Sequence, residues 1–391
     1  MGVLDSNITG DPFVAYRPIA ILVLTTGSPE RVITDVKKNG TSVAVLDNTI
    51  YTNWLLEISS VCQQNLSFEH KTLDSSGWIA DTNGKADFSL DYYEVTIDSS
   101  GLPVTAYDPD ATSLTPDATS NPFTVVNWSL PVDEYPSGVL SSTAGNYNLS
   151  DWQMTTGAER YLTNAPLIKD IELGQNEFLG VLSNTSPAFY RVIVYDANGV
   201  ALSDNQFNFG SGTVDYHDIA IGTANLVAAG VSLTGASYYT VRNYHTNTFN
   251  ATSEERRYNI VPSCSSDVRV HWCNEYGKQD SYTFKGNKTK SVTTDQRIYK
   301  RASYNLDEIG NQVYGNNKQE VLTTYTKTEN PDTIEWLSEM LLNKKVCIEQ
   351  NGIYLPIIIT GSDFSVTNDD SPIVQFSIEY IVSSQQPSFL F

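Results

Sequence analysis

The stretch that most constrains the fold of this chain runs from Val268 to Gly286. Apolar or aromatic residues alternate with polar ones at Val268, Val270 and Trp272, turn-forming residues follow from Asn274 to Asp280, and alternation resumes at Tyr282 and Phe284. Successive side chains of a β-strand point to opposite faces of the sheet, so a period of two indicates strands. The stretch predicts a β-hairpin that Trp272, Tyr282 and Phe284 pack onto its own domain.

The composition favours β-structure along the whole chain. Of 391 residues, 23 are tyrosine and only 3 are methionine, and 40% are hydrophobic. β-branched and aromatic side chains fit a pleated surface, and this length corresponds to several domains of about 150 residues each. We therefore expect a mainly β fold, with tandem antiparallel β-sandwich domains and a C-terminal α+β unit that contains one clear helix.

The first domain is expected to span residues 1–165 as an N-terminal β-sandwich. Two β-type runs, Arg31–Val36 and Ser42–Leu46, flank Asn39-Gly40, the dipeptide that type I′ hairpin turns prefer. The run from Trp54 to Asn65 has apolar residues three and four apart, which is compatible with a short helix or a strand. Residues 103–124 are rich in Pro, Asp, Ser and Thr, and we expect a linker or a loop that reaches a neighbouring subunit.

A second β-sandwich is expected over residues 166–255. The run Phe189–Tyr195 is β-branched and aromatic, and it leads through Asp196-Ala197-Asn198-Gly199 into Val200-Ala201-Leu202. Gly and Asn in such a cluster mark a turn between two strands.

A C-terminal β-rich α+β domain is expected over residues 256–391. Asn330 can cap a helix that starts at Pro331, and Ile334, Leu337 and Leu341 would form its apolar stripe. Strands are predicted after it, with an Asn351-Gly352 turn between the first two.

This C-terminal region resembles virion structural proteins of tailed phages that infect Bacteroidetes, the crAss-like phages among them. The resemblance rests on the tryptophan strand that leads through a Gly-containing turn into Ser281-Tyr282-Thr283-Phe284, and on the closing order of helix, strand, Asn-Gly turn, strand and final alternating strand. It covers about a third of the chain. It implies a neck or tail ring protein, located in the virion, assembled in the bacterial host cytoplasm, and in contact with copies of itself and with neighbouring virion proteins.

The charge argues against nucleic acid as a partner. The formal net charge is −21, and phosphate binding needs a Lys and Arg surface. Residues 256–345 carry 14 basic and 11 acidic residues, whereas residues 1–255 carry 10 basic and 29 acidic ones. Such asymmetry suits the docking of identical subunits through complementary patches, although an acidic surface also serves solubility alone.

No cofactor or metal ion is expected. The four cysteines, Cys62, Cys264, Cys273 and Cys347, are scattered, and we expect them to be reduced and buried. Cys264, His271 and Cys273 lack a fourth ligand at zinc-binding spacing, which favours core packing for His271. No apolar run is long enough to span a membrane.

Three aromatic residues, Trp128, Tyr147 and Trp152, lie among Pro, Ser, Gly and Asn. Exposed aromatics in loops can stack on sugars or fill a partner's pocket, so they are candidate glycan or subunit contacts. The alternative is that they seal the ends of a sandwich.

The search for catalytic groupings yields no nucleophile elbow, no phosphate-binding glycine loop and no His-Glu-x-x-His. His217 lies beside Asp215 and Asp218, but no nucleophile can be named for it, and a solvated loop is expected there. The sequence thus favours a non-enzymatic structural subunit of a tailed phage virion that assembles as a ring or sleeve. The alternatives are a receptor- or glycan-recognition module of the tail and, less favoured, a glycan-degrading enzyme.

Overall fold

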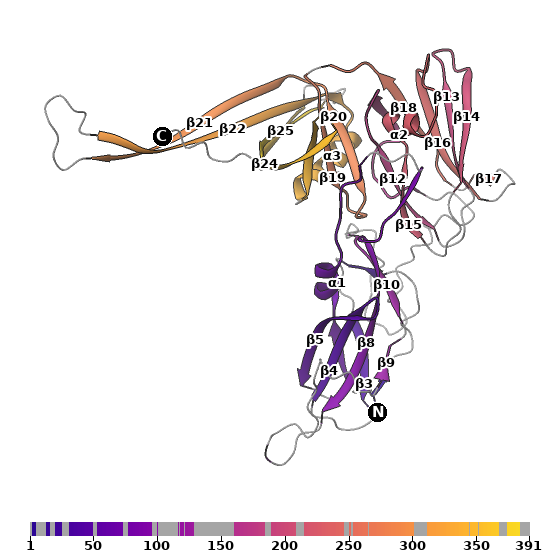
Figure 1. Ribbon diagram of the computed structural model, residues 1–391, viewed down its shortest axis with the longest axis vertical. Helices are drawn as coiled ribbons and strands as arrows, with labels where there is room; N and C mark the ends of the chain where they lie inside the picture. Colours follow the sequence, from indigo (N-terminus) through magenta and orange to yellow (C-terminus); the bar gives the residue numbers. More distant parts are fainter. Residues whose placement is uncertain are drawn as a thin grey trace.

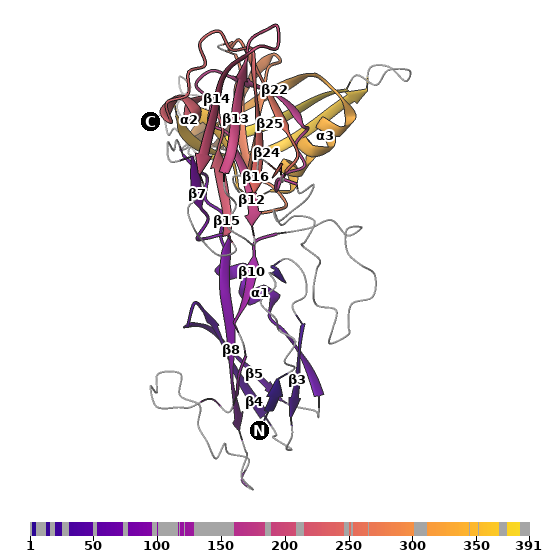
Figure 2. The same ribbon diagram turned by 90° about the vertical axis from the view of Figure 1, so that its right-hand side faces the viewer.

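The chain folds into three lobes, shown in Figure 1 by a computed structural model. The structure describes residues 2–4, 13–15, 20–25, 31–49, 53–72, 77–95, 100, 116, 118–120, 122–128, 160–183, 189–208, 215–245, 250–251, 253–264, 266–300, 311–343, 345–350, 352–366 and 374–383. The N-terminal lobe lies within residues 2–128, the middle lobe comprises residues 160–261 with 78–80, and the C-terminal lobe lies within residues 266–383. In both views the N-terminal lobe extends away from the other two (Figures 1 and 2).

The N-terminal lobe is a sandwich of a three-stranded sheet, order β1-β3-β6, and a larger sheet, order β2-β10-β8-β4-β5, with β9 paired to β8. Its elements are β1 (Gly2–Leu4), β2 (Phe13–Val14), β3 (Ala20–Thr25), β4 (Arg31–Lys38), β5 (Thr41–Thr49), β6 (Asn53–Glu57), α1 (Ser59–Asn65), β8 (Lys85–Val95), β9 (Ala118–Thr119) and β10 (Phe123–Val126). Side chains from both sheets and from α1 form one core that includes Val36, Leu56, Cys62 and Phe88.

Two local predictions for this lobe can be compared with the structure. Asn39 and Gly40 have φ angles of 49° and 81°, the left-handed values that a type I′ turn needs, so the predicted hairpin β4–β5 is confirmed. The ambiguous run from Trp54 to Asn65 contains both alternatives, because strand β6 ends at Glu57 and helix α1 begins at Ser59.

The middle lobe packs a sheet of order β11-β18-β16-β13-β14, with β17 paired to β16, against a smaller sheet of order β12-β15-β7. Its elements are β7 (Trp78–Ala80), β11 (Ile168–Glu172), β12 (Phe178–Ser183), β13 (Phe189–Tyr195), β14 (Ala201–Asn208), β15 (Asp215–Ala220), α2 (Thr223–Ala228), β16 (Tyr238–His245), β17 (Asn250–Ala251) and β18 (Arg256–Val261). Strand β7 comes from the first 100 residues, and β18 lies beyond residue 255. Strand pairing therefore links this lobe to both neighbouring sequence regions.

The C-terminal lobe is a seven-stranded antiparallel sheet of order β20-β19-β23-β24-β25-β22-β21. Its elements are β19 (Val268–Cys273), β20 (Gln279–Phe284), β21 (Lys288–Lys300), β22 (Asn311–Glu329), α3 (Pro331–Ser338), a 3-10 helix (Glu339–Leu342), β23 (Val346–Gln350), β24 (Ile353–Val366) and β25 (Val374–Val382). The predicted helix is confirmed: Asn330 Oδ1 accepts a hydrogen bond from the Thr333 N–H at 2.8 Å, and Pro331 occupies the first turn.

The mainly β fold with one clear C-terminal helix is thus as predicted. Helix α3 buries Trp336 and Leu337 against the sheet, in a core that includes Trp272, Phe284 and Ile378. In Figure 2 the strands β13, β14 and β16 lie in front of the C-terminal lobe, so the two upper lobes pack side by side.

Candidate functional site

The longest feature of the C-terminal lobe is a hairpin that projects from it, made of β21 and β22 (Figure 1). The two strands pair from Lys288 with Thr324 to Lys300 with Asn311. Strand β22 also pairs with β25, but that pairing begins only at Leu322. Residues 291–300 and 311–321, here called the arm, therefore pair only with each other among the described strands.

The outer strand edges of the arm have no partner among the described strands, and apolar side chains of the arm are exposed. Strand β21 is the last strand of the sheet, so one of its edges has no partner strand in the part of the chain that the structure describes. Val292 and Ile298 are 48% and 57% exposed. A two-stranded hairpin alone is marginally stable in water, and an open edge is a template for pairing with another chain.

The base of the arm is fixed to the body by close contacts. The Gly286 N–H donates to the Tyr325 carbonyl at 2.8 Å, and a Cβ at position 286 would lie 2.6 Å from that same oxygen, so only glycine fits. The Tyr282 hydroxyl contacts Glu329 Oε1 at 2.5 Å. Lys327 Nζ lies 2.9 Å from Asp170 Oδ2 of the middle lobe. These contacts tie the base of the hairpin to the C-terminal lobe and to the middle lobe.

The hairpin that the sequence singled out is β19–β20, and it forms the contact between the two upper lobes. Trp272 and Phe284 are fully buried in the C-terminal core, and Tyr282 is partly buried against it. Trp272 and Trp336 have ring centroids 5.1 Å apart. The opposite face of the hairpin lies against the middle lobe and carries polar side chains, which are buried too.

The first buried polar cluster joins β19 to the middle lobe through Arg269, Glu177 and Lys169. Arg269 Nη2 lies 2.6 Å from Glu177 Oε2, and Lys169 Nζ lies 2.7 Å from Glu177 Oε1. Burial raises the pKa of Glu177, but Lys169 and Arg269 together bring it below its usual value. Glu177 is thus a carboxylate held between two cations, as a buried charge requires.

The second buried cluster joins all three regions of the chain. Lys278 Nζ lies 3.0 Å from Asp81 Oδ2 and 3.3 Å from Asp218 Oδ2, and Lys71 Nζ lies 3.7 Å from Asp81 Oδ1. Burial raises the pKa of Asp218. The expectation of a solvated loop around His217 is wrong: His217 and Asp218 lie in strand β15 and are 2% and 0% exposed.

His271 lies on the polar face of β19 in the position expected of a core residue. Its Nε2 is 3.0 Å from Glu349 Oε2, and its Nδ1 is 3.0 Å from Gln279 Nε2. Burial, and next the neighbouring Arg269, lower the pKa of His271 well below its usual value, so the ring is neutral.

The cysteines are all free thiols, but they are not all buried as expected. Cys62 and Cys347 are buried, whereas Cys264 is exposed and Cys273 is half-buried. Among the described residues no group of three His, Cys, Asp or Glu side chains could hold a metal ion. Within the same residues no helix is long and apolar enough to cross a membrane.

Of the three candidate aromatic contacts, the structure describes only Trp128, and its burial favours the alternative of a sealing aromatic over an exposed contact. Its side chain is 0% exposed, its Nε1 donates to the Tyr216 hydroxyl at 3.2 Å, and its ring meets Tyr276 edge to face. A fully buried ring has no face for a sugar or a partner, and Trp128 instead seals the contact between lobes. Tyr147 and Trp152 lie outside the described residues, as does most of the 103–124 segment.

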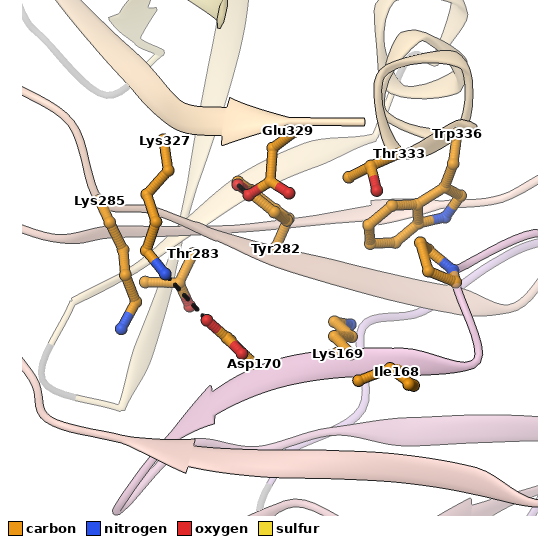
Figure 3. Close-up of a pocket in the computed structure, with 11 residues that line it drawn as sticks. Ile168, Lys169, Asp170, Tyr282, Thr283, Lys285, Lys327, Glu329, Thr333 and Trp336 are labelled. Atoms are coloured by element: carbon orange, nitrogen blue, oxygen red, sulfur yellow. Dashed lines mark hydrogen bonds and ion pairs between the residues drawn. The ribbon is translucent and has the colours of Figure 1, made fainter. Parts of the chain in front are cut away.

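A cleft lies between the base of the arm and the middle lobe (Figure 3). Its volume is about 160 Å³, and Tyr282, Trp336, Lys285, Lys327 and Asp170 are among the residues that line it. Pockets for small-molecule ligands usually measure about 300–1,000 Å³. The Lys327–Asp170 ion pair, drawn as a dashed line, spans the cleft and connects the C-terminal lobe to the middle lobe.

Comparisons with known proteins give limited information. The sequence matches no known family profile, and no curated protein is similar to it. Among solved structures, a chain from the virion of a native gene transfer agent particle aligns at 12% identity with a TM-score of 0.20. A chain from the C6-symmetric tail of an empty gene transfer agent particle aligns at 11% identity with a TM-score of 0.23. Each alignment covers 33% of this chain and 99% of the other, and scores this low establish no shared fold for the whole chain.

Proposed function

We propose that this protein is a non-enzymatic structural subunit of a tailed phage particle, and that it assembles with copies of itself into a ring or sleeve of the neck or tail. One observation carries the proposal: strand β21 has no partner on its outer edge in the part of the chain that the structure describes, and Val292 and Ile298 of the same strand are exposed. A second chain that covers this edge would complete the sheet.

Charge supports a second copy as the covering chain. Strand β21 carries Lys288, Lys290, Arg297 and Lys300 against Asp295 alone, whereas the chain as a whole has a net charge of −21. A basic strand on an acidic molecule is attracted to another copy of that molecule. The sequence resemblance of the C-terminal region to phage virion proteins supports the particle as the setting.

A structural subunit also requires lobes that keep a fixed orientation relative to one another. The buried clusters around Glu177 and Lys278 join the middle and C-terminal lobes, and Asp81 brings in the segment that leads from the N-terminal lobe. Charges buried in this way tolerate little displacement, because each loses its partner when the lobes separate. The lobes therefore keep a fixed orientation while the arm engages a neighbour.

The test compares two exposed valines in otherwise identical chains. Val292→Lys alters the arm, and Val200→Lys alters the β13–β14 turn, where Val200 is 59% exposed. We expect Val292→Lys to shift the protein from oligomer to monomer in light scattering at matched concentrations, and Val200→Lys to leave the oligomer intact. A wild-type chain that is monomeric and absent from purified particles of the phage that encodes it would contradict the proposal.

A further inference from the structure

The second buried cluster, here called the box, comprises Lys278, Asp81, Asp218, Lys71 and Tyr216. It places the Lys278 amine between two carboxyl groups that are buried away from solvent. Lys278 and Asp218 are 1% and 0% exposed, and Asp81 is 7% exposed. The ammonium lies 3.0 Å from Asp81 and 3.3 Å from Asp218, and 3.3 Å from the centroid of the Tyr216 ring. These ion-pair and cation–ring contacts hold the Lys278 amine beside the Asp218 carboxyl group, and such fixed proximity is what favours a reaction between two groups.

The fold reserves space for the lysine to reach Asp218. Gly180 on β12 pairs with Asp218 on β15, and a Cβ at position 180 would lie 2.3 Å from Lys278 Cγ. A side chain at Gly180 would therefore displace the lysine stem. Gly277, at φ +67°, lets the turn before Lys278 approach the Asn127 carbonyl, which a Cβ would meet at 2.2 Å.

The two carboxyl groups have different surroundings. The Asp81 Oδ1 accepts the Gly84 N–H at 2.9 Å, and Lys278 and Lys71 together hold the pKa of Asp81 below its usual value although burial acts to raise it. Asp218 lies deeper, burial raises its pKa, and its Oδ1 has no hydrogen-bond partner among the described residues. Asp81 is thus held in its ionised form, and burial shifts Asp218 towards its protonated form.

We propose that Lys278 and Asp218 are joined by an intramolecular isopeptide bond, with Asp81 as the proton carrier. Asp81 first takes a proton from the Lys278 ammonium, which leaves a neutral amine. The Nζ lone pair attacks Cγ of protonated Asp218 and forms the C–N bond. Asp81 delivers its proton to the departing hydroxyl, the C–O bond breaks, and water leaves, while Asp81 receives the second proton from nitrogen.

This balance needs no other reactant: an ammonium, a carboxylate and a carboxylic acid become an amide, a water molecule and a carboxylic acid. Amide formation from an acid and an amine is hindered in water, but fixed reactants can have effective concentrations of about 10⁵ M or more. Exclusion of water from the box opposes hydrolysis of the product.

The neighbouring pair of Lys169 and Glu177 shows why the isopeptide bond is proposed for Lys278 alone. Lys169 Nζ lies 2.7 Å from Glu177, which is closer than Lys278 to either aspartate. The fixed cation Arg269, at 2.6 Å, keeps Glu177 ionised, and a carboxylate is a poor electrophile. In the box around Lys278 the second cation is Lys71, whose Nζ lies 3.9 Å from Asp218 Oδ2, and burial still raises the pKa of Asp218 above its usual value.

Intact mass spectrometry of the purified, denatured full-length chain tests the proposal, and it does not depend on the virion role. We expect a mass lower than that of the sequence by one water molecule, and a cross-linked peptide that contains both Lys278 and Asp218 after proteolysis. A folded protein with the full sequence mass would overturn the proposal. So would a link to Asp81, or a water lost elsewhere that leaves both peptides linear.

Variants of the three proposed reacting residues provide a second test by mass spectrometry. Lys278→Met and Asp218→Ala should each restore the full mass expected for the variant, and Asp81→Ala should leave most of the chain unlinked. Asp204→Ala, on the exposed strand β14, is the matched control and should keep the water deficit. If a box variant fails to fold, the wild-type mass and peptide map still decide the question.

Discussion

The junction between the middle and C-terminal lobes differs from the arm in how far its groups are covered within the chain. At the junction, charged groups such as Arg269 and Glu177 are buried and each is paired, so this region is complete within a single chain. In the arm, the apolar side chains of Val292 and Ile298 are exposed, and the outer edge of β21 has no partner among the described strands. This difference is the basis of our proposal that the body is stable alone and that another chain completes the arm.

The largest effect is expected from breaking the junction. Arg269→Met leaves Glu177 buried with Lys169 as its one remaining cation among the described residues, and removing one partner of a buried pair costs about 3–5 kcal/mol. We expect a loss of that size in the free energy of unfolding measured with denaturant. The control is Arg191→Met, which removes a partly exposed pair with Asp204 and should cost less than about 1 kcal/mol. Equal losses in the two variants would contradict the role of the junction.

Acid should weaken the contact that His70 makes with the C-terminal lobe, where its ring centroid lies 5.6 Å from that of Tyr354. Burial, and next Lys345, lower the pKa of His70 to about 4, from an unfolded value of about 6.5. The unfolded chain therefore binds more protons between these values, and stability falls as the pH drops from about 6.5 towards 4. His70 should contribute about 2–3 kcal/mol to this loss, from about 1.4 kcal/mol for each pKa unit.

Denaturant unfolding at pH 7 and pH 4.5 measures this loss, and His70→Gln provides the comparison. The variant should show a smaller decrease between the two pH values than the wild type. An unchanged pH dependence would assign the acid sensitivity to other groups.

A helix cap gives a smaller, local effect. Asn330→Ala removes the hydrogen bond from the Thr333 N–H and should cost about 1 kcal/mol in unfolding free energy. The substitution lies outside the arm and the junction, so the oligomeric state should not change. Loss of the oligomer in this variant would show that assembly depends on the stability of the body as well as on the arm.

The smallest effect on stability is expected in the arm. Val292→Lys replaces a side chain that is 48% exposed, and such surface changes usually stay within about 0.5 kcal/mol. Thermal unfolding of the monomeric variant should therefore match that of dissociated wild-type protein. A large loss would mean that the arm packs on its own chain.

The sequence predicts the local elements well and the contacts between lobes poorly. Strands β19 and β20 are close to the predicted hairpin, although Gln279 and Asp280, expected in the turn, lie in a strand. Alternation shows that Arg269 and His271 share a face of β19, and on a lone hairpin that face would be in water. The middle lobe buries it, which depends on residues about 90 positions earlier, such as Glu177.

The arm could not be predicted from the sequence for a different reason. Its strands are rich in Thr, Lys, Gln and Asn, and their sequences lack a sustained apolar alternation. Hydrophobic periodicity reveals strands that pack on their own domain, and it is a weak signal for strands that lack such packing. Trp128 shows the converse, since its Pro- and Ser-rich surroundings indicate a loop although its side chain is buried.

Amide hydrogen exchange of residues 291–300, compared between the assembled protein and the dissociated monomer, is the most direct test of the arm as the assembly surface. We predict strong protection of these amides on assembly, with little change in β19 and β20, which are already buried in the monomer. Equal exchange of the arm in both states, with new protection confined to other surfaces, would contradict the account.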